Sequence, residues 1–91
     1  PPDGIVAASD LIAITAIQVL HSRGLTVPGD VKVVGYDDLP FARNSVPPLT
    51  TVRQDIANGA RQMVELLLKR IEGETTGSIV LNPVLVIRLS T

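Results

Sequence analysis

The chain has 91 residues, 45% of them hydrophobic, and a formal net charge of −1, which suits one small folded domain or part of a larger one. Its eight lysine and arginine residues are scattered, which argues against nucleic-acid binding by these residues, and the absence of cysteine excludes thiolate metal sites and thiol catalysis. The longest apolar run falls far short of the roughly 20 residues of a membrane helix, so we expect no contact with a membrane.

A β-α-β pattern opens the chain. The apolar run at residues 4–8 is typical of a strand in a parallel sheet that is covered on both faces. Ser9 and Asp10 follow with N-cap chemistry, and we expect Asp10 to cap a helix over residues 11–23. Residues 31–36 predict a second strand, and such a crossover implies a parallel pair. The predicted fold class is therefore α/β with a parallel sheet.

The first predicted helix is apolar over most of its circumference. Between Leu11 and Leu20 only Thr15 and Gln18 are polar. A helix of this kind is normally buried on more than one side. One side fits the sheet. For the other side we favour a second subunit, and the alternative is enclosure by a larger domain of the same chain.

The second half of the chain predicts a loop, a helix and two short apolar runs. Prolines block regular pairing over residues 39–52, although the end of this stretch alternates like a short extended segment. Asp55 is placed to cap an amphipathic helix over residues 56–72. Residues 79–81 and 84–89 are β-rich, and the Asn-Pro pair between them forces a bend.

Two segments bring polar groups to the carboxyl edge of the predicted sheet, where ligands of open parallel sheets collect. These segments are residues 8–10 and 35–38. A carboxylate there accepts two hydroxyl hydrogen bonds at once, which suits a sugar, a nucleoside or another polyhydroxylated ligand. We predict that Asp37 contacts the ligand and that Asp38 is a turn or cap residue. Ser9 stays open between a cap and a ligand contact.

The remaining candidates have less specific signals. Tyr36 and Phe41 are the only aromatic residues, and they either pack or line a site. Arg53 and Gln54 fit a solvated approach to the second helix. We find no nucleophilic arrangement, no phosphate-binding loop and no cluster around the single histidine, so we expect neither catalysis nor a metal or other cofactor.

Four stretches occur in a characteristic order: IVAASDLIA at 5–13, RGLTVPGDV at 23–31, VGYDD at 34–38 and PPLTTVRQ at 47–54. Together they resemble the C-terminal half of the lactose-repressor and galactose-repressor (LacI/GalR) family of bacterial transcription regulators. The PPLTTVRQ segment discriminates best, because related periplasmic sugar-binding proteins share the G-[YF]-D strand but not usually this segment. The resemblance covers essentially the whole chain.

The resemblance implies an effector-binding domain of the type I periplasmic-binding-protein fold, of which this chain is a C-terminal fragment. That fold has two Rossmann-like α/β lobes joined by three crossing strands, with the ligand between them. Residues 1–52 would belong to the C-terminal lobe and residues 53–81 to the N-terminal lobe, with the helix at 56–72 and a short strand. Residues 82–91 would return to the C-terminal lobe.

The resemblance also implies roles for particular residues. Asp37 matches the aspartate that binds effector hydroxyls or a base, and Ser9 stands where some members place a ligand-contacting asparagine. The implied effector-binding residues are Asp37, Ser9, Tyr36, Phe41 and Ile56, although isoleucine replaces an aromatic residue at position 56. The implied dimer-interface residues are Leu11, Ile14, Ile17, Phe41 and Val46.

Three functions follow as hypotheses. The first is effector sensing and dimerisation in a cytoplasmic bacterial regulator, with a sugar or sugar derivative as effector, a homodimer as the assembly, and DNA bound only by a head outside these residues. The second is a periplasmic-type sugar receptor of the same fold without DNA binding. The third is an enzyme-like acidic receiver that holds magnesium with Asp37 and Asp38.

Overall fold

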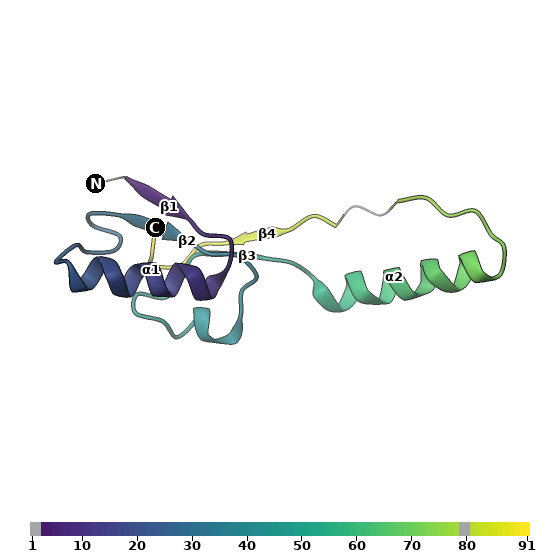
Figure 1. The fold of residues 1–91 in the computed structure, drawn as a ribbon, viewed down its shortest axis with the longest axis horizontal. Helices are drawn as coiled ribbons and strands as arrows, with labels where there is room; N and C mark the ends of the chain where they lie inside the picture. The colour runs from purple at the N-terminus through teal and green to yellow at the C-terminus, as the bar shows by residue number, and fades with distance from the viewer. Residues whose placement is uncertain (1–2, 79–80) are drawn as a thin grey trace. The chain divides into compact units, whose positions relative to one another are not determined.

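The computed structural model describes residues 3–78 and 81–91 of the chain. The chain forms two compact units, which Figure 1 traces in order from the N-terminus to the C-terminus. Unit 1 comprises Pro1–Arg53 and Val84–Thr91, and unit 2 comprises Gln54–Pro83. Neither helix in the described ranges has both the length and the apolar character that crossing a membrane requires.

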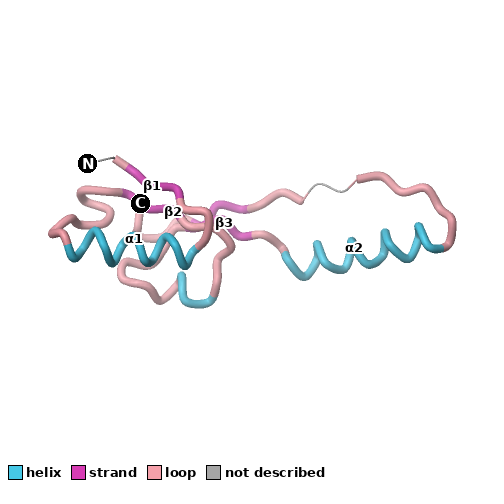
Figure 2. Tube along the Cα trace, viewed as in Figure 1, coloured by secondary structure: helices cyan, strands magenta, loops and turns pink. Residues whose placement is uncertain are grey.

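Unit 1 begins with the predicted β-α-β arrangement. Strand β1 (Gly4–Val6) pairs in parallel with β2 (Lys32–Val34), and Ile5 lies opposite Val33. Helix α1 (Asp10–Ser22) connects the two strands, as Figure 2 shows. The structure confirms the parallel pair predicted from the apolar runs. Both strands are shorter than predicted, because the ladder holds only three residues on each side.

A second pair of strands completes unit 1. Strand β3 (Thr51–Arg53) pairs antiparallel with β4 (Val84–Val86). A parallel bridge between Val34 and Thr50 joins β2 to the residue just before β3. The short 3-10 helix η1 (Pro40–Ala42) lies in the proline-rich connection. The structure therefore confirms the extended segment and the final strand predicted for the second half of the chain.

The N-terminal cap of α1 differs from the prediction. The side chain of Ser9, not that of Asp10, caps the helix, and its Oγ accepts a hydrogen bond from Ile12 N at 3.2 Å. Asp10 is the first helical residue, and its carboxylate has other partners, which are described below. At the other end, Gly24 follows the helix with a φ of 78°, a conformation that favours glycine.

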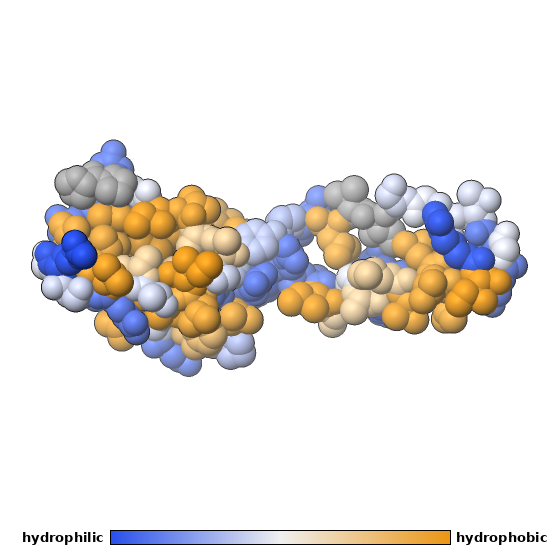
Figure 3. Space-filling view, viewed as in Figure 1, coloured by the Kyte–Doolittle hydropathy of each residue, from blue (hydrophilic) through white to orange (hydrophobic). Residues whose placement is uncertain are grey.

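The core of unit 1 lies between one face of α1, strand β2 and the connection that precedes β3. Ala13 and Ile17 of α1, Val31 and Val33 around β2, and Leu49 are buried there. The opposite face of α1 is apolar but open, and with Ile5 of β1 it lines a hollow of about 550 Å³. Figure 3 shows apolar side chains gathered over this part of unit 1. That this face is covered by a second subunit stays a prediction.

Unit 2 consists of α2 (Ile56–Ile71) and the segment that follows it. Asp55 caps the helix as predicted, since its Oδ1 accepts a hydrogen bond from Asn58 N at 3.1 Å. Leu81 packs over Gly59, because a β-carbon added to that glycine would lie only 2.7 Å from Leu81 Cδ1. The structure confirms the second predicted helix and its capping aspartate.

The apolar face of α2 has little cover within the described residues. The large side chains on that face are more than half exposed: Ile56, Met63, Val64, Leu67, Leu68 and Ile71. Of the β-rich run predicted at 79–81, residues 79 and 80 lie outside the described residues, and Leu81 is not in a strand.

Candidate functional site

The loop Gly35–Asp38 continues β2 beyond its carboxyl end, and backbone hydrogen bonds hold it from two sides. Asp37 N donates to Val52 O at 2.8 Å, which ties the loop to β3. Asp10 N donates to Tyr36 O at 3.0 Å, which ties the loop to the first turn of α1. The loop is therefore fixed between a helix start and a strand.

Two consecutive aspartates in this loop have unusual backbone angles. Asp37 has a φ of 107° and Asp38 a φ of 54°. Residues with a side chain rarely adopt positive φ, and such a conformation costs on the order of 1 to 3 kcal/mol for each residue. Such a conformation persists only where the surrounding contacts determine it.

The carboxylate of Asp10 is one of these contacts. Asp10 is fully buried. Its Oδ2 accepts a hydrogen bond from Leu39 N at 2.6 Å, and its Oδ1 accepts one from Thr51 Oγ1 at 2.5 Å. A buried carboxylate is stable only when such donors replace water. The buried carboxylate of Asp10 therefore links α1 both to the end of the loop and to β3.

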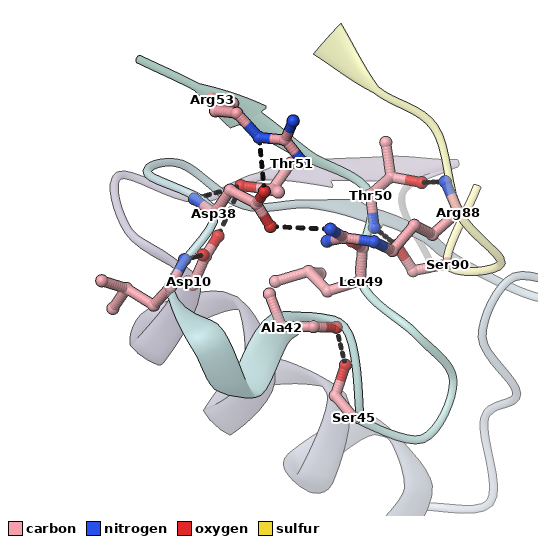
Figure 4. A network of polar contacts seen from close by, with 11 residues as sticks. Asp10, Asp38, Ala42, Ser45, Leu49, Thr50, Thr51, Arg53, Arg88 and Ser90 are labelled. Atoms are coloured by element: carbon pink, nitrogen blue, oxygen red, sulfur yellow. Dashed lines mark hydrogen bonds and ion pairs between the residues drawn. The ribbon is translucent and has the colours of Figure 1, made fainter. Parts of the chain in front are cut away.

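Asp38 joins the loop to the two strands of the second pair. Its Oδ2 lies 2.8 Å from Arg53 Nε, and its Oδ1 lies 2.8 Å from Arg88 Nη2. Figure 4 shows the carboxylate with one guanidinium on each side. The prediction that the Asp38 side chain serves nearby backbone amides is wrong, because both oxygens pair with arginines from distant positions.

The charge state of Asp38 follows from these partners. Desolvation by burial raises its pKa, but the hydrogen bonds and positive charges of Arg88 and then Arg53 outweigh this effect. The pKa therefore lies below the ordinary value of 3.8. The carboxylate is ionised at neutral pH, as a two-sided ion pair requires.

Asp37 differs from both of these carboxylates. It is half-buried, and within residues 3–78 and 81–91 its carboxylate accepts no hydrogen bond. Its backbone is fixed by the bond to Val52 O and by its neighbour Asp38. Asp37 thus presents an acceptor that unit 1 does not use, on a loop that unit 1 holds rigidly.

The other predicted effector-binding residues lie in varied environments. Ser9 is half-buried and its hydroxyl oxygen already caps α1. Tyr36 is half-buried beside Asp37, whereas Phe41 in η1 is 42% exposed. Ile56 begins α2 in unit 2 and is 63% exposed. Within unit 1, Tyr36 and Asp37 are thus neighbours on one loop, and Ser9 lies at the α1 end of the same edge.

The predicted dimer-interface residues divide into two groups. Leu11 and Val46 are exposed, at 63% and 82%, and Phe41 is also open. Ile14 is partly buried against the core, and Ile17 is only 3% exposed within it. Ile17 is therefore part of the core of unit 1, and its role at a dimer interface stays a prediction.

A polar hollow of about 420 Å³ lies beside the loop. Its lining residues are Asp38, Leu39, Pro40, Arg43 and Asn44. Asp37 is not among them. The hollow therefore belongs to the Asp38 side of the loop, whereas the predicted ligand contact is on its neighbour.

Reasoning from the sequence did not find the partners of Asp10 and Asp38. Thr51 is 41 residues from Asp10, and Arg88 is 50 residues from Asp38. We expected Arg53 to be solvated. Its side chain is 51% exposed, but it also pairs with Asp38. No periodic pattern reports contacts at these separations. The one sequence signal for a site here was the pair of adjacent carboxylates at the end of an apolar strand.

Comparison with known proteins adds a separate line of observation. Residues 1–91 match a family model described as a periplasmic binding protein-like domain. The transcriptional regulator CelR of Thermobifida fusca is 49% identical over 74 residues, which cover 81% of this chain and 22% of the relative. The chain spans 22% to 28% of the length of the curated relatives that it matches.

Two solved structures extend this comparison. A complex of the transcriptional regulator CelR with cellobiose has a TM-score of 0.90 and 45% identity, and the match covers 98% of this chain and 28% of that one. The lac repressor dimer bound to operator and the anti-inducer ONPF has a TM-score of 0.94 and 35% identity, with 99% and 32% covered. The order of secondary-structure elements described above is therefore shared with proteins of known structure.

Proposed function

Because the chain belongs to the family of periplasmic binding protein-like domains, we propose that it is the effector-sensing and dimerising portion of a bacterial transcription regulator of the lactose-repressor and galactose-repressor type. The family match and the solved relatives confirm the α/β fold class and the resemblance found in the sequence. DNA would be bound by residues outside this chain, and the protein would act in the cytoplasm.

The single observation that carries the proposal is the unused carboxylate of Asp37. Hydroxyl groups of a sugar donate hydrogen bonds, and a charged acceptor makes these bonds strong. Asp37 offers such an acceptor at the carboxyl edge of a parallel pair, the position at which open α/β sheets bind ligands. Tyr36 would shape the site beside it, and Ser9 would contribute a polar contact.

Sensing requires more than binding. The effector must bind one conformation of the regulator more tightly than another, since equal affinity for both shifts no equilibrium. We propose that the preferred conformation changes how the dimer presents its DNA-binding heads. The open apolar face of α1, with Leu11, and the exposed Val46 supply the proposed dimer surface.

The assignment of residues to lobes remains part of the proposal. Residues 1–52 and 82–91 would form one lobe of the effector domain, and residues 53–81 would belong to the other. Unit 1 and unit 2 divide the chain at nearby positions, which supports this assignment. Phe41 and Ile56 stay candidates for the walls of the site.

The two competing functions have weaker support. A transport-type receptor of the same fold would share the Asp37 site, but the matched relatives are named as transcriptional regulators. A magnesium-holding receiver needs both aspartates free, and Asp38 is already held by two arginines. We therefore propose a regulator and not an enzyme.

The test is an Asp37→Ala variant of the intact regulator. Loss of a charged hydrogen-bond partner should weaken sugar binding by about 1.5 to 3 kcal/mol, or roughly 10- to 150-fold, with operator affinity nearly unchanged. Titration calorimetry with cellobiose, sucrose and glucose identifies a sugar that binds the parent and then compares the variant. Glu65→Ala, which removes an exposed carboxylate from α2, is the matched control.

Two results would count against the proposal. Equal sugar affinity in Asp37→Ala and the parent would remove Asp37 from the site. A parent protein that binds none of the three sugars would contradict the choice of a sugar as effector.

A further inference from the structure

The Asp38 carboxylate lies where three segments of unit 1 meet. Its own loop carries the candidate ligand contact Asp37. Arg53 is the last residue of β3, directly before the chain passes into unit 2. Arg88 follows β4, by which the chain has returned to unit 1. One side chain is thus paired with the strand that leaves unit 1 and with the segment that comes back; we call this contact the Asp38 clamp.

The two arms of the Asp38 clamp are held differently. The Arg88 side chain is 12% exposed, its Nη1 also donates to Leu49 O at 2.8 Å, and its backbone N donates to Thr50 Oγ1 at 2.8 Å. Arg88 is therefore fixed at several points. The Arg53 side chain is 51% exposed, and within residues 3–78 and 81–91 its only side-chain partner is Asp38.

This asymmetry makes the Arg53 arm the easier of the two to open. A half-exposed arginine regains water when it leaves its partner, so the Arg53 arm opens at small cost, as for surface ion pairs in general. The Arg88 side chain and the Asp38 carboxylate are both nearly buried. If the Arg88 arm opened, both charges would lose a partner without regaining full contact with water, which is costly. In the structure the clamp is closed, with both arms on Asp38, and an open clamp would have the Arg53 arm in solvent.

The loop transmits a change at Asp37 directly to the clamp. Asp37 and Asp38 both have positive φ, and the amide of Asp37 is bonded to Val52 of β3. Because contacts hold this backbone, a ligand bound at the Asp37 carboxylate would act on the adjacent residue, Asp38, which carries the clamp. Contacts maintain the strained backbone at such a site. For Asp38 the strongest of these contacts are the two ion pairs of the clamp.

We propose that Asp38 is a positioning residue that couples the Asp37 loop to both strands by which the chain leaves and rejoins unit 1. Sugar at Asp37 stabilises one state of the clamp, and the Arg53 arm passes this preference to β3. The inference rests on the proposed function. It assigns Asp38 and Arg53 to the response to effector, whereas Asp37 serves its binding.

The test measures the response separately from sugar affinity. Operator affinity of the intact regulator is determined by fluorescence anisotropy, on the promoter DNA of its own gene, without sugar and at a sugar concentration far above the dissociation constant of each variant. The sugar is the one of cellobiose, sucrose and glucose that binds the parent. The ratio of the two operator affinities is the response, and saturation removes any loss of sugar binding from it.

Three variants carry the test. Asp38→Asn keeps the size of the side chain and removes its charge, and Arg53→Gln removes the half-exposed arm with little risk to folding. We expect the response ratio to fall about tenfold in both, within the range of ordinary coupling between two sites. Asp30→Asn is the matched control, because its carboxylate contacts only Thr26 and neither strand of the clamp.

The outcomes separate the two proposals. A parent that responds to sugar, with a reduced response in Arg53→Gln and in any folded Asp38→Asn, supports the clamp. A parent-like response in Arg53→Gln, or in folded Asp38→Asn, overturns the clamp and leaves the proposed function intact. A parent whose operator affinity does not change with sugar overturns the proposed function and the clamp together. A purely structural role for Asp38 would lower stability without changing the ratio.

Discussion

Gly35 lies against the buried carboxylate of Asp10, which holds the loop Gly35–Asp38. A β-carbon at this position would collide with Asp10 Oδ1 and would lie 2.8 Å from Leu49 Cδ2. Neither neighbour has room to move, because Asp10 and Leu49 are both fully buried. Glycine is therefore needed here for close approach and not for a positive φ. The bond network of Asp10 depends on the absence of one methyl group.

At the scale of a single residue, we predict that Gly35→Ala destabilises the intact protein by about 1 to 3 kcal/mol, the usual cost of overpacking a core. Urea titration gives the free energy of unfolding. Gly77→Ala is the matched control, since an added β-carbon there meets nothing within 4 Å, and it should change stability by less than about 0.5 kcal/mol. A Gly35→Ala variant as stable as the control would show that the Asp10 contact relaxes freely.

Caps and apolar faces define the two α-helices in the described part of the chain. Ser9 and Asp55 each accept a backbone N–H at a helix start, and a glycine with positive φ follows each helix end. The faces differ in their cover. Helix α1 buries Ala13 and Ile17 in unit 1, whereas the large apolar residues of α2 are open within the described chain.

At the scale of an element, substitutions of Ser9 test whether its side chain caps α1. Ser9→Ala should lower the free energy of unfolding by about 1 kcal/mol, because Ile12 N loses its acceptor. Ser9→Asn restores an acceptor of good capping type and should recover most of this loss. Thermal and urea unfolding of both variants measure it. Equal stability of Ser9→Ala and the parent would contradict the cap assignment.

At the scale of the whole molecule, each unit has large apolar side chains that are more than half exposed, such as Leu11 in unit 1 and Met63 in unit 2. The open face of α2 and the apolar hollow on α1 are two such surfaces. Such surfaces are normally covered. We expect the α2 face to be covered by another chain, by a rearranged packing or by protein beyond these residues.

Sedimentation velocity of the 91-residue chain tests this expectation. The chain should self-associate, and replacing Leu67 and Leu68 of α2 by glutamine should reduce association, because both side chains are more than half exposed on the apolar face. Glu65→Gln on the same helix is the control and should associate like the parent. A monodisperse, well-folded monomer of the parent chain would contradict the expectation.

The kind and order of the elements could be predicted from the amino-acid sequence. The parallel β-α-β start, both helices and the cap at Asp55 were predicted within a few residues, because apolar spacing and cap residues act through neighbours in the chain. The resemblance in four short stretches determined the fold family for the same reason: a fixed order of local motifs is itself a sequence property.

The partners of the three carboxylates at the sheet edge became known only from the folded arrangement. The sequence predicted a cap at Asp10, a ligand contact at Asp37 and a turn or cap residue at Asp38, but it did not identify their partners. In the structure Asp10 is buried against Thr51, Asp38 is paired with Arg53 and Arg88, and the Asp37 carboxylate is left unused. Their partners lie 15 to 50 residues away in the chain. Hydrogen-bond and ion-pair partners are chosen by proximity in space, which local spacing does not encode.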